Sequence, residues 1–359
     1  MRTVSRFVVL FVLCSLLVCF CSVTCVHAVD STVFIKVDGT VDGTDKITRN
    51  GDVYIFTADV SGSLTVNRDN VIIEGGGYTL QGSGLENSKG VYLEYRTKVT
   101  VQNLVVKDFD YGICVFSSTN CTVKSNTVTA NLSGGAPWAQ YGVLLLYVSN
   151  SLVVGNTVTN THCGISFQNS NNNAVSGNIV TSNGRGVELI LSQNNLVSRN
   201  YAANNDNGIV IENQNNHILD NVATNNNDAG IYLYTATLNE VTGNNITNNV
   251  RGMHLVSCTD NTINGNNFVG NTVQVDSESS ENNWSSAQQG NYWGDYTGLD
   301  SNQNGVGDTP YVIDDDNQDN YPLMAAVEVE EIPEFSSWTV LFVAVAVLAV
   351  VLLVYKRKL

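Results

Sequence analysis

Basic residues are scarce in this chain of 359 residues, which contains 17 Lys and Arg against 33 Asp and Glu and has a formal net charge of −16. A protein that binds nucleic acid through its phosphates needs a basic surface, so we expect no nucleic-acid partner. Only 14% of the residues are charged and 43% are hydrophobic, which argues against intrinsic disorder. Asn, Thr and Ser supply most of the polar character, and this composition favours strands and turns over helices.

Two apolar segments stand at the ends of the sequence. Residues 1–28 combine two arginines, an apolar run and a small-residue cleavage pattern, which predicts a signal peptide, with an uncleaved anchor as the alternative. Residues 338–355 are apolar throughout and ~27 Å long as a helix, which predicts a single transmembrane helix. The tail at residues 356–359 contains three basic residues, so we expect it in the cytoplasm and the rest of the protein at the cell surface, anchored to the membrane.

The segment between these ends is more acidic than the whole chain. Five of the 17 basic residues and none of the acidic ones lie in the two terminal segments, which leaves 12 basic against 33 acidic residues and a net charge of −21. Such a segment prefers cations to polyanions. Its four cysteines, Cys114, Cys121, Cys163 and Cys258, are too scattered for a disulfide framework, although Cys114 and Cys121 are close enough in sequence to pair.

A repeat of 22 residues runs through the chain. A Gly followed by two apolar residues that flank a variable one recurs at steps of 22, 30, 22, 22, 22, 22 and 22 residues, at Gly90, Gly112, Gly142, Gly164, Gly186, Gly208, Gly230 and Gly252. The long step contains an insertion of about eight residues, near residues 131–138. An Asn eight residues before most of these glycines keeps the same phase, and in one copy it slips to Asn221, where Val222 takes its place.

Each repeat holds short alternating strands separated by Asn and Gly turns, with no stretch long enough for a helix. This pattern predicts an all-β, single-stranded parallel β-helix of about nine or ten coils, because each coil can stack on the one before it. Its core would hold one aliphatic residue per coil, and the recurring Asn would form a ladder of side-chain amides. A leucine-rich repeat is disfavoured because its consensus is absent.

We divide the chain accordingly. After the signal peptide come an N-terminal cap (residues 29–65), the repeats (66–283), a C-terminal cap (284–324) and an acidic linker (325–337), and the transmembrane helix follows.

A family resemblance rests on these coils and on two flanking segments. NVIIEGGGYTLQGSG at residues 70–84 and NYWGDYTGLDSNQNGVGDTPYVID at 291–314 resemble NosD-like right-handed β-helix proteins of the archaeal cell-surface type. The resemblance covers residues 66–324 and implies the wider class of carbohydrate-binding proteins and sugar hydrolases. The tripeptide at 333–335 is similar to a PEF-type sorting signal, which would make a sorting protease a partner and leaves open whether the anchor is retained.

Carbohydrate could bind to residues that face outward beside the repeat Gly. The second and fourth residues after each Gly should point out and stack along the β-helix, and they include the candidates Tyr92, Tyr232, Tyr234 and His254. Trp138 in the insertion could also stack on a sugar, or fold back over the surface. The alternative is that these aromatics favour strands for packing alone.

Catalysis would need converging carboxylates. Asp206 and Asp228 each precede a repeat Gly by two residues and should stack one coil apart, with Glu188 and Glu212 nearby, as in a polysaccharide lyase or hydrolase. Asp before Gly is also ordinary turn chemistry, and the paired Asp-Asp and Arg-Ile-Lys motifs of polygalacturonase-like enzymes are absent.

The C-terminal cap contains the spacing of a calcium loop. Oxygen ligands stand at positions 1, 3, 5, 7 and 9 of this loop: Asp300, Asn302, Asn304, the carbonyl of Val306, and Asp308. Tyr311 replaces the bidentate Glu at position 12, so affinity would be modest unless one of Asp314 to Asp316 folds back. We therefore expect a structural Ca²⁺, with a purely hydrogen-bonded turn as the alternative.

The NosD resemblance also implies a role in copper-enzyme maturation, which the residues disfavour. Copper sites use His, Met and Cys, and the sequence has only four His and three Met. Four Asn-X-Ser/Thr acceptors for glycosylation occur, at Asn120, Asn131, Asn245 and Asn283.

The sequence therefore predicts a surface-anchored β-helix that binds an envelope or extracellular polysaccharide or glycoprotein, with a calcium-stabilised cap. A polysaccharide lyase or glycoside hydrolase is the first alternative, and a copper-maturation accessory protein is the second.

Overall fold

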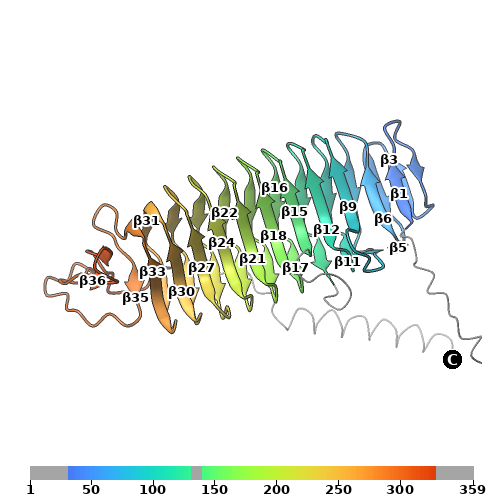
Figure 1. Ribbon diagram of the computed structural model, residues 1–359. Coiled ribbons are helices and arrows are strands. Elements are labelled where there is room, and N and C mark those ends of the chain that lie inside the picture. The colour runs from blue at the N-terminus through green and yellow to red at the C-terminus, as the bar shows by residue number, and fades with distance from the viewer. Residues whose placement is uncertain (1–30, 131–139, 329–359) are drawn as a thin grey trace, which may run out of the picture. The chain divides into compact units, whose positions relative to one another are not determined.

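A computed structural model describes residues 31–130 and 140–328 and shows a right-handed parallel β-helix without helices in these residues. Three parallel sheets, here A, B and C, run along the stack, and each coil contributes one strand to each of them (Figure 1). No helix in the described part of the chain is long and apolar enough to cross a membrane. The predicted signal peptide, the insertion with Trp138 and Asn131, the tripeptide that is similar to a sorting signal and the predicted transmembrane segment lie outside the described residues.

The parallel strands of the three sheets are short and regularly repeated. Sheet A contains β1 (Thr32–Ile35), β6 (Ser63–Val66), β9 (Lys89–Glu94), β12 (Tyr111–Phe116), β15 (Tyr141–Leu146), β18 (Cys163–Gln168), β21 (Arg185–Ile190), β24 (Asn207–Glu212), β27 (Ala229–Tyr234), β30 (Arg251–Val256) and β33 (Val273–Glu278). Sheet B contains β4 (Val53–Phe56), β7 (Ile72–Glu74), β10 (Thr100–Gln102), β13 (Thr122–Lys124), β16 (Leu152–Val154), β19 (Ala174–Ser176), β22 (Leu196–Ser198), β25 (His217–Leu219), β28 (Glu240–Thr242), β31 (Thr259–Asn264) and β34 (Glu281–Asn283). Sheet C contains β5 (Val60–Ser61), β8 (Thr79–Gln81), β11 (Val105–Lys107), β14 (Thr127–Thr129), β17 (Thr157–Thr159), β20 (Ile179–Thr181), β23 (Tyr201–Ala203), β26 (Val222–Thr224), β29 (Asn245–Thr247), β32 (Asn267–Val269) and β35 (Tyr292–Trp293).

Sheet C has eleven strands, so the described residues form eleven coils rather than the nine or ten predicted. The additional coils come from the segment before the first repeat Gly, where β1 already pairs in parallel with β6. These coils could not be recognised from the sequence, because the segment lacks the regular Gly and Asn positions. Two antiparallel strands, β2 (Val41–Asp42) beside β1 and β3 (Ile47–Asn50) beside β4, cover the N-terminal edges of sheets A and B.

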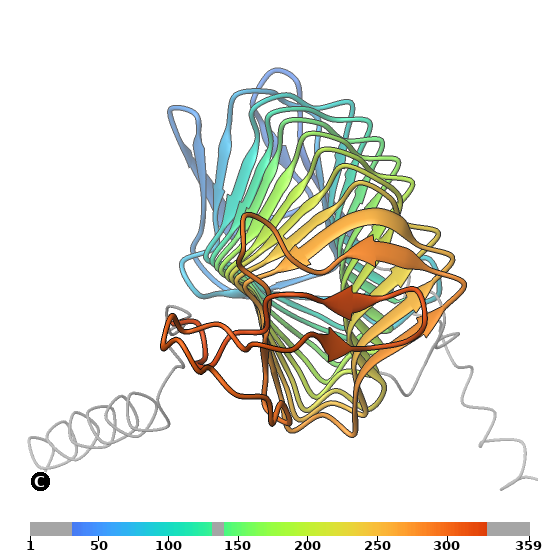
Figure 2. The same ribbon diagram turned by 90° about the vertical axis from the view of Figure 1, so that its left-hand side faces the viewer.

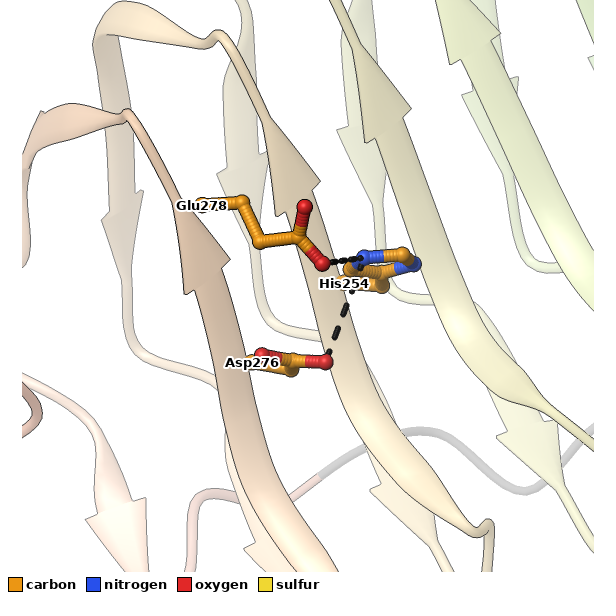
Figure 3. Close-up of side chains that lie close together, drawn as sticks. All are labelled: His254, Asp276 and Glu278. Carbon is orange, nitrogen blue, oxygen red and sulfur yellow. Dashed lines mark hydrogen bonds and ion pairs between the residues drawn. The ribbon is translucent and has the colours of Figure 1, made fainter.

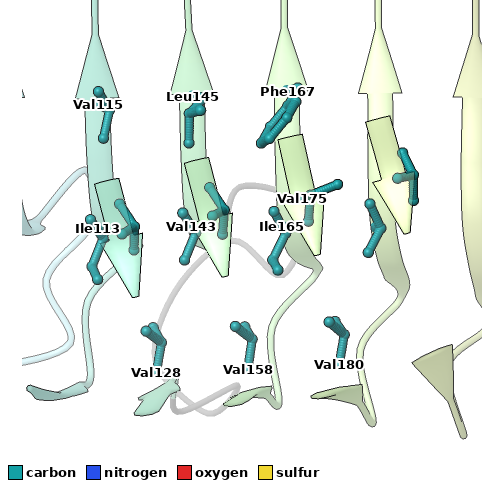
Figure 4. Close-up of a cluster of buried hydrophobic side chains, with 14 of the residues drawn as sticks. Ile113, Val115, Val128, Val143, Leu145, Val158, Ile165, Phe167, Val175 and Val180 are labelled. Atoms are coloured by element: carbon teal, nitrogen blue, oxygen red, sulfur yellow. The ribbon is translucent and has the colours of Figure 1, made fainter. Parts of the chain in front are cut away.

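The core is a set of aliphatic stacks, as predicted. The residue after each repeat Gly, from Val91 to Met253, is fully buried, and the register places these side chains directly above one another. Figure 4 shows such rows in neighbouring coils, for example Ile113, Val143 and Ile165. Each fully buried aliphatic side chain stabilises the fold by about 1.5–3 kcal/mol relative to exposure, so repetition builds a large core from short strands.

The predicted amide ladder is confirmed at the corner between sheets B and C. Each Asn receives hydrogen bonds on its Oδ1 from the backbone N–H and the Nδ2 of the Asn one coil earlier, through Asn126, Asn156, Asn178, Asn200, Asn221, Asn244, Asn266 and Asn291. The expectation that Val222 replaces the Asn in one coil is wrong. Asn221 keeps the position because the coil before it is one residue shorter and the next one is longer.

A C-terminal cap closes the stack, as seen end-on in Figure 2. The cap contains the antiparallel pair β36 (Tyr311–Val312) and β37 (Gln318–Asp319). Asn317, just before β37, and Asp319, at its end, accept the hydrogen bonds that a further coil would accept. Trp293, on the last strand of sheet C, stacks on Tyr311 of β36 at 4.1 Å between ring centroids. The cap therefore satisfies the last coil and keeps its edge from pairing with another chain.

Candidate functional site: the outer face of sheet A

The outer face of sheet A carries three rows of side chains, because its repeat strands have six residues. The first row runs through Lys89, Tyr111, Tyr141, Cys163, Arg185, Asn207, Ala229, Arg251 and Val273. The central row runs through Tyr92, Cys114, Leu144, Ser166, Glu188, Val210, Tyr232, His254 and Asp276. The third row runs through Glu94, Phe116, Leu146, Gln168, Ile190, Glu212, Tyr234, Val256 and Glu278.

This face differs from those of sheets B and C. Most strands there have three residues and present mainly Thr, Ser and aliphatic side chains, as in β14 and β17. Sheet A instead gathers tyrosines, a phenylalanine, arginines and acids. The predicted stacking of the second and fourth residues after each Gly is confirmed by the register.

The central row is less accessible than its outward direction suggested. Cys114, Leu144, Ser166, Glu188 and Val210 are buried, because the first and third rows flank them on both sides. Tyr92 and Tyr232 are half-buried, His254 is nearly buried, and Tyr234 in the third row is 42% exposed. The sequence pattern could not show this burial, because it depends on side chains from neighbouring coils.

A polar cluster lies in the middle of this face. The guanidinium of Arg185 pairs with Glu188, which is only 2% exposed, and the Ser166 hydroxyl donates to Glu188 Oε2 at 2.9 Å. Partial burial, together with the negative charge of Glu188, raises the pKa of Glu212. Burial and the same charge raise the pKa of the Cys163 thiol well above its usual range. Glu188 is thus enclosed and paired with Arg185, and the buried Cys163 thiol stays protonated near neutral pH.

A second cluster lies near the C-terminal end of the same face. Arg251 pairs with Asp228, and its Nη1 donates to Asp276 Oδ2 at 3.1 Å. His254 Nε2 lies 3.4 Å from Glu278 Oε1, and its ring stacks on Tyr232 at 4.8 Å between centroids. Figure 3 shows His254 on β30 facing Asp276 and Glu278 on the neighbouring strand β33, with an interaction to each carboxylate. Sequence reasoning proposed His254 as a ligand-binding residue but missed Asp276 and Glu278, which occupy the degenerate repeat after Gly252.

The predicted catalytic aspartates occupy adjacent coils but take separate partners. The Asp228 N–H donates to the Asp206 carbonyl at 2.8 Å, as stacking requires. The Asp228 carboxylate binds Arg251, while Asp206 Oδ1 accepts from Asn227 Nδ2 at 3.2 Å. Each carboxylate therefore has a structural role that does not require the other.

The four cysteines of the β-helix are free thiols, and all are buried. Cys114 and Cys121 therefore do not pair. Burial raises the pKa of the Cys114 thiol to about 11, which keeps it protonated near neutral pH.

The predicted calcium loop is closed by hydrogen bonds between its own backbone N–H groups and its aspartate side chains. The two carboxylate oxygens of Asp300 accept from the N–H groups of Asn304 at 3.1 Å and Gly305 at 2.8 Å, and Asp308 Oδ2 accepts from Ser301 N–H at 2.9 Å. Hydrogen bonds from Ser301 lower the pKa of Asp308. Asp314 to Asp316 line a shallow pocket beside Ser277 and Glu281, on the side of β33 and β34.

Residues 37–206 and 137–298 match the profile of the family described as periplasmic copper-binding protein (NosD), which together spans most of the chain. The chain belongs to the NosD family. No curated protein sequence matches it.

Three solved structures are similar to this NosD-family chain, and the one with a TM-score of 0.50 shares its fold. A mutant of the periplasmic alginate epimerase AlgG is 15% identical with a TM-score of 0.50, and the match covers 81% of this chain and 75% of the epimerase. The Dettilon tailspike protein is 16% identical with a TM-score of 0.48, covering 67% of this chain and 59% of the tailspike, so the chain spans less than two thirds of that protein. A hyperthermoactive exopolygalacturonase from Thermotoga maritima is 13% identical with a TM-score of 0.45, covering 67% and 75%.

The described residues do not fit the copper that the family description names. Within residues 31–130 and 140–328, one group of three could hold a metal: His254, Asp276 and Glu278. It offers a single imidazole, and Arg251 Nη1 lies 3.3 Å from His254 Nε2 while it binds Asp276. The guanidinium thus supplies the positive charge that a metal ion would bring, and copper prefers His, Met and Cys ligands. His217 lies on sheet B and binds Glu240.

Proposed function

We propose that this protein binds an extended carbohydrate polymer along the outer face of sheet A. The observation that supports this proposal is the concentration of aromatic and charged side chains on one of three otherwise similar faces. A rigid face with aromatic rings on several of its coils offers an extended polymer stacking contacts at more than one point along its length. We place the protein at the cell surface, exported by residues 1–28 and anchored by residues 338–355, with an envelope or extracellular polysaccharide or glycoprotein as partner.

The test compares two tyrosines on different faces. Tyr232→Ala removes a half-buried ring from sheet A, and Tyr201→Ala removes one from β23 of sheet C. On an array of polysaccharides, the parent protein should bind, Tyr232→Ala should bind about tenfold more weakly, and Tyr201→Ala should be unchanged. A parent protein that binds no polysaccharide, or equal losses in both variants, would contradict the proposal.

Binding without turnover is the outcome we propose. Arg185 pairs with Glu188, and Arg251 pairs with Asp228. The four candidates Asp206, Asp228, Glu188 and Glu212 therefore include no adjacent pair of carboxylates that are both without such a partner. Reducing-sugar and unsaturated-product assays on bound polysaccharides would detect cleavage. Turnover that is lost in Asp206→Asn would support the lyase or hydrolase alternative instead.

We also propose that the loop from Asp300 to Asp308 binds a structural Ca²⁺. Side-chain oxygens from four residues and the Val306 carbonyl are held in one tight turn, with Gly305 at a φ of 85°. Each oxygen that accepts one N–H keeps a further lone pair for a cation.

A further inference from the structure

At one corner of the β-helix, nine successive coils place a residue with a positive φ. The residue after each strand of sheet A, from β9 to β33, has a positive φ, namely Tyr95, Ser117, Tyr147, Asn169, Leu191, Asn213, Thr235, Ser257 and Ser279. Asn tolerates this conformation, whereas a bulky side chain is strained in it. Six of these coils use Asn, Ser or Thr, and the two tyrosines and Leu191 are therefore exceptions that their backbone does not favour.

Both tyrosine side chains project into solvent. Tyr95 is 64% exposed and Tyr147 is 56% exposed. Phe116, in the third row of sheet A, meets each of them edge to face, at 5.9 Å from Tyr95 and 6.0 Å from Tyr147 between ring centroids. These contacts fix the rings without covering them. Tyr95 and Tyr147 are two coils apart, about 10 Å at the spacing of neighbouring strands.

We propose that Tyr95, Phe116 and Tyr147 form a subsite on which uncharged sugar rings of the polymer stack. This inference rests on the proposed function and extends the binding face to a corner that no sequence motif marks. A pyranose presents C–H groups on its face and hydroxyls at its edge, so it can cover an exposed aromatic ring while its polar edge stays in water. Strained residues that are held in place by their surroundings are characteristic of binding sites.

The charges nearby favour an uncharged sugar over a uronate. Glu94 lies beside Phe116 in the third row, and Arg96 is paired with Asp69 at 3.3 Å. On the same face, the ammonium of Lys89 lies over the Tyr92 ring at 4.6 Å. A sugar carboxylate at the subsite would therefore meet an acid and a cation that already has a partner.

Asparagine substitutions separate binding from stability. Tyr95→Asn and Tyr147→Asn insert the residue that Asn169 uses at the same position, so each variant should fold with an unchanged or higher Tm. Leu191→Asn is the matched control, since Leu191 is also exposed with a positive φ but has no ring. The full chain would be titrated with cellohexaose, laminarihexaose, N-acetylated chitohexaose and an alginate hexamer by calorimetry.

The expected result is binding of an uncharged hexamer by the parent, about tenfold weaker binding by the double tyrosine variant, and no change in Leu191→Asn. Preference for the alginate hexamer, or an equal loss in Leu191→Asn, would overturn the stacking subsite, the latter in favour of general apolar docking. A double variant that binds as the parent does would overturn the subsite alone. A parent that binds none of the four would overturn both the subsite and the proposed function.

Discussion

Asn178 shows why one residue type recurs at a single corner of every coil. Its Oδ1 accepts from the N–H and Nδ2 of Asn156, and its own Nδ2 donates to the carbonyls of Val153 and Ser176 and to Asn200 Oδ1. The side chain is fully buried. One amide therefore satisfies backbone groups in two coils that no water could reach, which a shorter or apolar side chain could not do.

Replacing this amide should be costly. We expect Asn178→Ala to lower the free energy of unfolding by about 3 kcal/mol, because it leaves several buried donors and acceptors without partners. Asn227→Ala is the control, since Asn227 is exposed and donates a single side-chain hydrogen bond, to Asp206. Urea unfolding followed by circular dichroism would measure both, and equal effects would contradict this role of the ladder.

Glu212 should make stability depend on pH. Its pKa is raised by partial burial and by Glu188, so the folded protein holds this proton more tightly than the unfolded chain does. The contribution of the protonated group to stability is full below the ordinary value of 4.5 and is lost as pH rises through the folded pKa.

Glu212→Gln keeps an uncharged group at every pH, so its stability relative to the parent should increase from about pH 4 to about pH 8. Chemical denaturation across this range would measure the difference. Glu281→Gln, at an exposed site in β34, serves as the control. A difference for Glu212→Gln that does not vary with pH would contradict the raised pKa.

At the scale of the strand, the repeat Gly allows neighbouring coils to approach each other closely. A Cβ built at Gly208 would lie 2.5 Å from the carbonyl oxygen of Gly230 and 2.9 Å from Asn226 Nδ2. The same crowding recurs at Gly186 and Gly230. The Gly row and the amide ladders at the corners therefore depend on each other, because the added atom would displace both the next strand and the nearest amide.

We expect Gly208→Ala to destabilise the protein by about 2 kcal/mol through this overpacking. Gly177→Asn should have a much smaller effect, since nothing lies within 4 Å of an added Cβ there and Asn tolerates its φ of 62°. Thermal and urea unfolding of the two variants would test the comparison. A neutral Gly208→Ala would show that neighbouring coils can move apart without loss.

The sequence predicted the strands wherever a coil repeated the regular Gly and Asn positions. The Gly and Asn positions predicted the parallel coils, the buried stack from Val91 to Met253 and one amide ladder, because each mark has a fixed backbone role. Two further ladders, such as that through Asn195 and Asn216, were missed because Asn is common throughout the chain. The ion pairs of Arg185 and Arg251 join different rows or coils, so spacing along one strand could not predict them.

At the scale of the whole β-helix, the ends of the stack need covering. Each coil contacts only its neighbours, so a terminal coil lacks half of its partners unless a cap supplies them. Asp319 does so for the last coil by accepting from Asn291 N–H at 2.7 Å and from Trp293 Nε1 at 2.9 Å. The loop from Asp300 to Asp308 is joined to the same cap by an isolated antiparallel β-bridge between Val306 and Leu323.

Calcium should therefore stabilise the molecule from this end. At a concentration about 100-fold above its Kd, Ca²⁺ should add about 2.7 kcal/mol to the stability of the bound state and raise the Tm. Asp300→Ala and Asp308→Ala should abolish this rise, while Asp45→Ala at the other end should leave it intact. Titration calorimetry of the parent chain that detects no calcium heat would contradict the proposal.

The long step in the repeat has a consequence for how this molecule can change over time. Thr127 pairs with Thr157 and Tyr111 pairs with Tyr141, so both sheets keep their register although an insertion enters the chain between β14 and β15. The corner between sheets C and A thus tolerates added length without any change to the pitch of the stack. Corresponding corners, such as that between β20 and β21, are natural positions at which evolution or an engineer could add recognition loops one coil at a time.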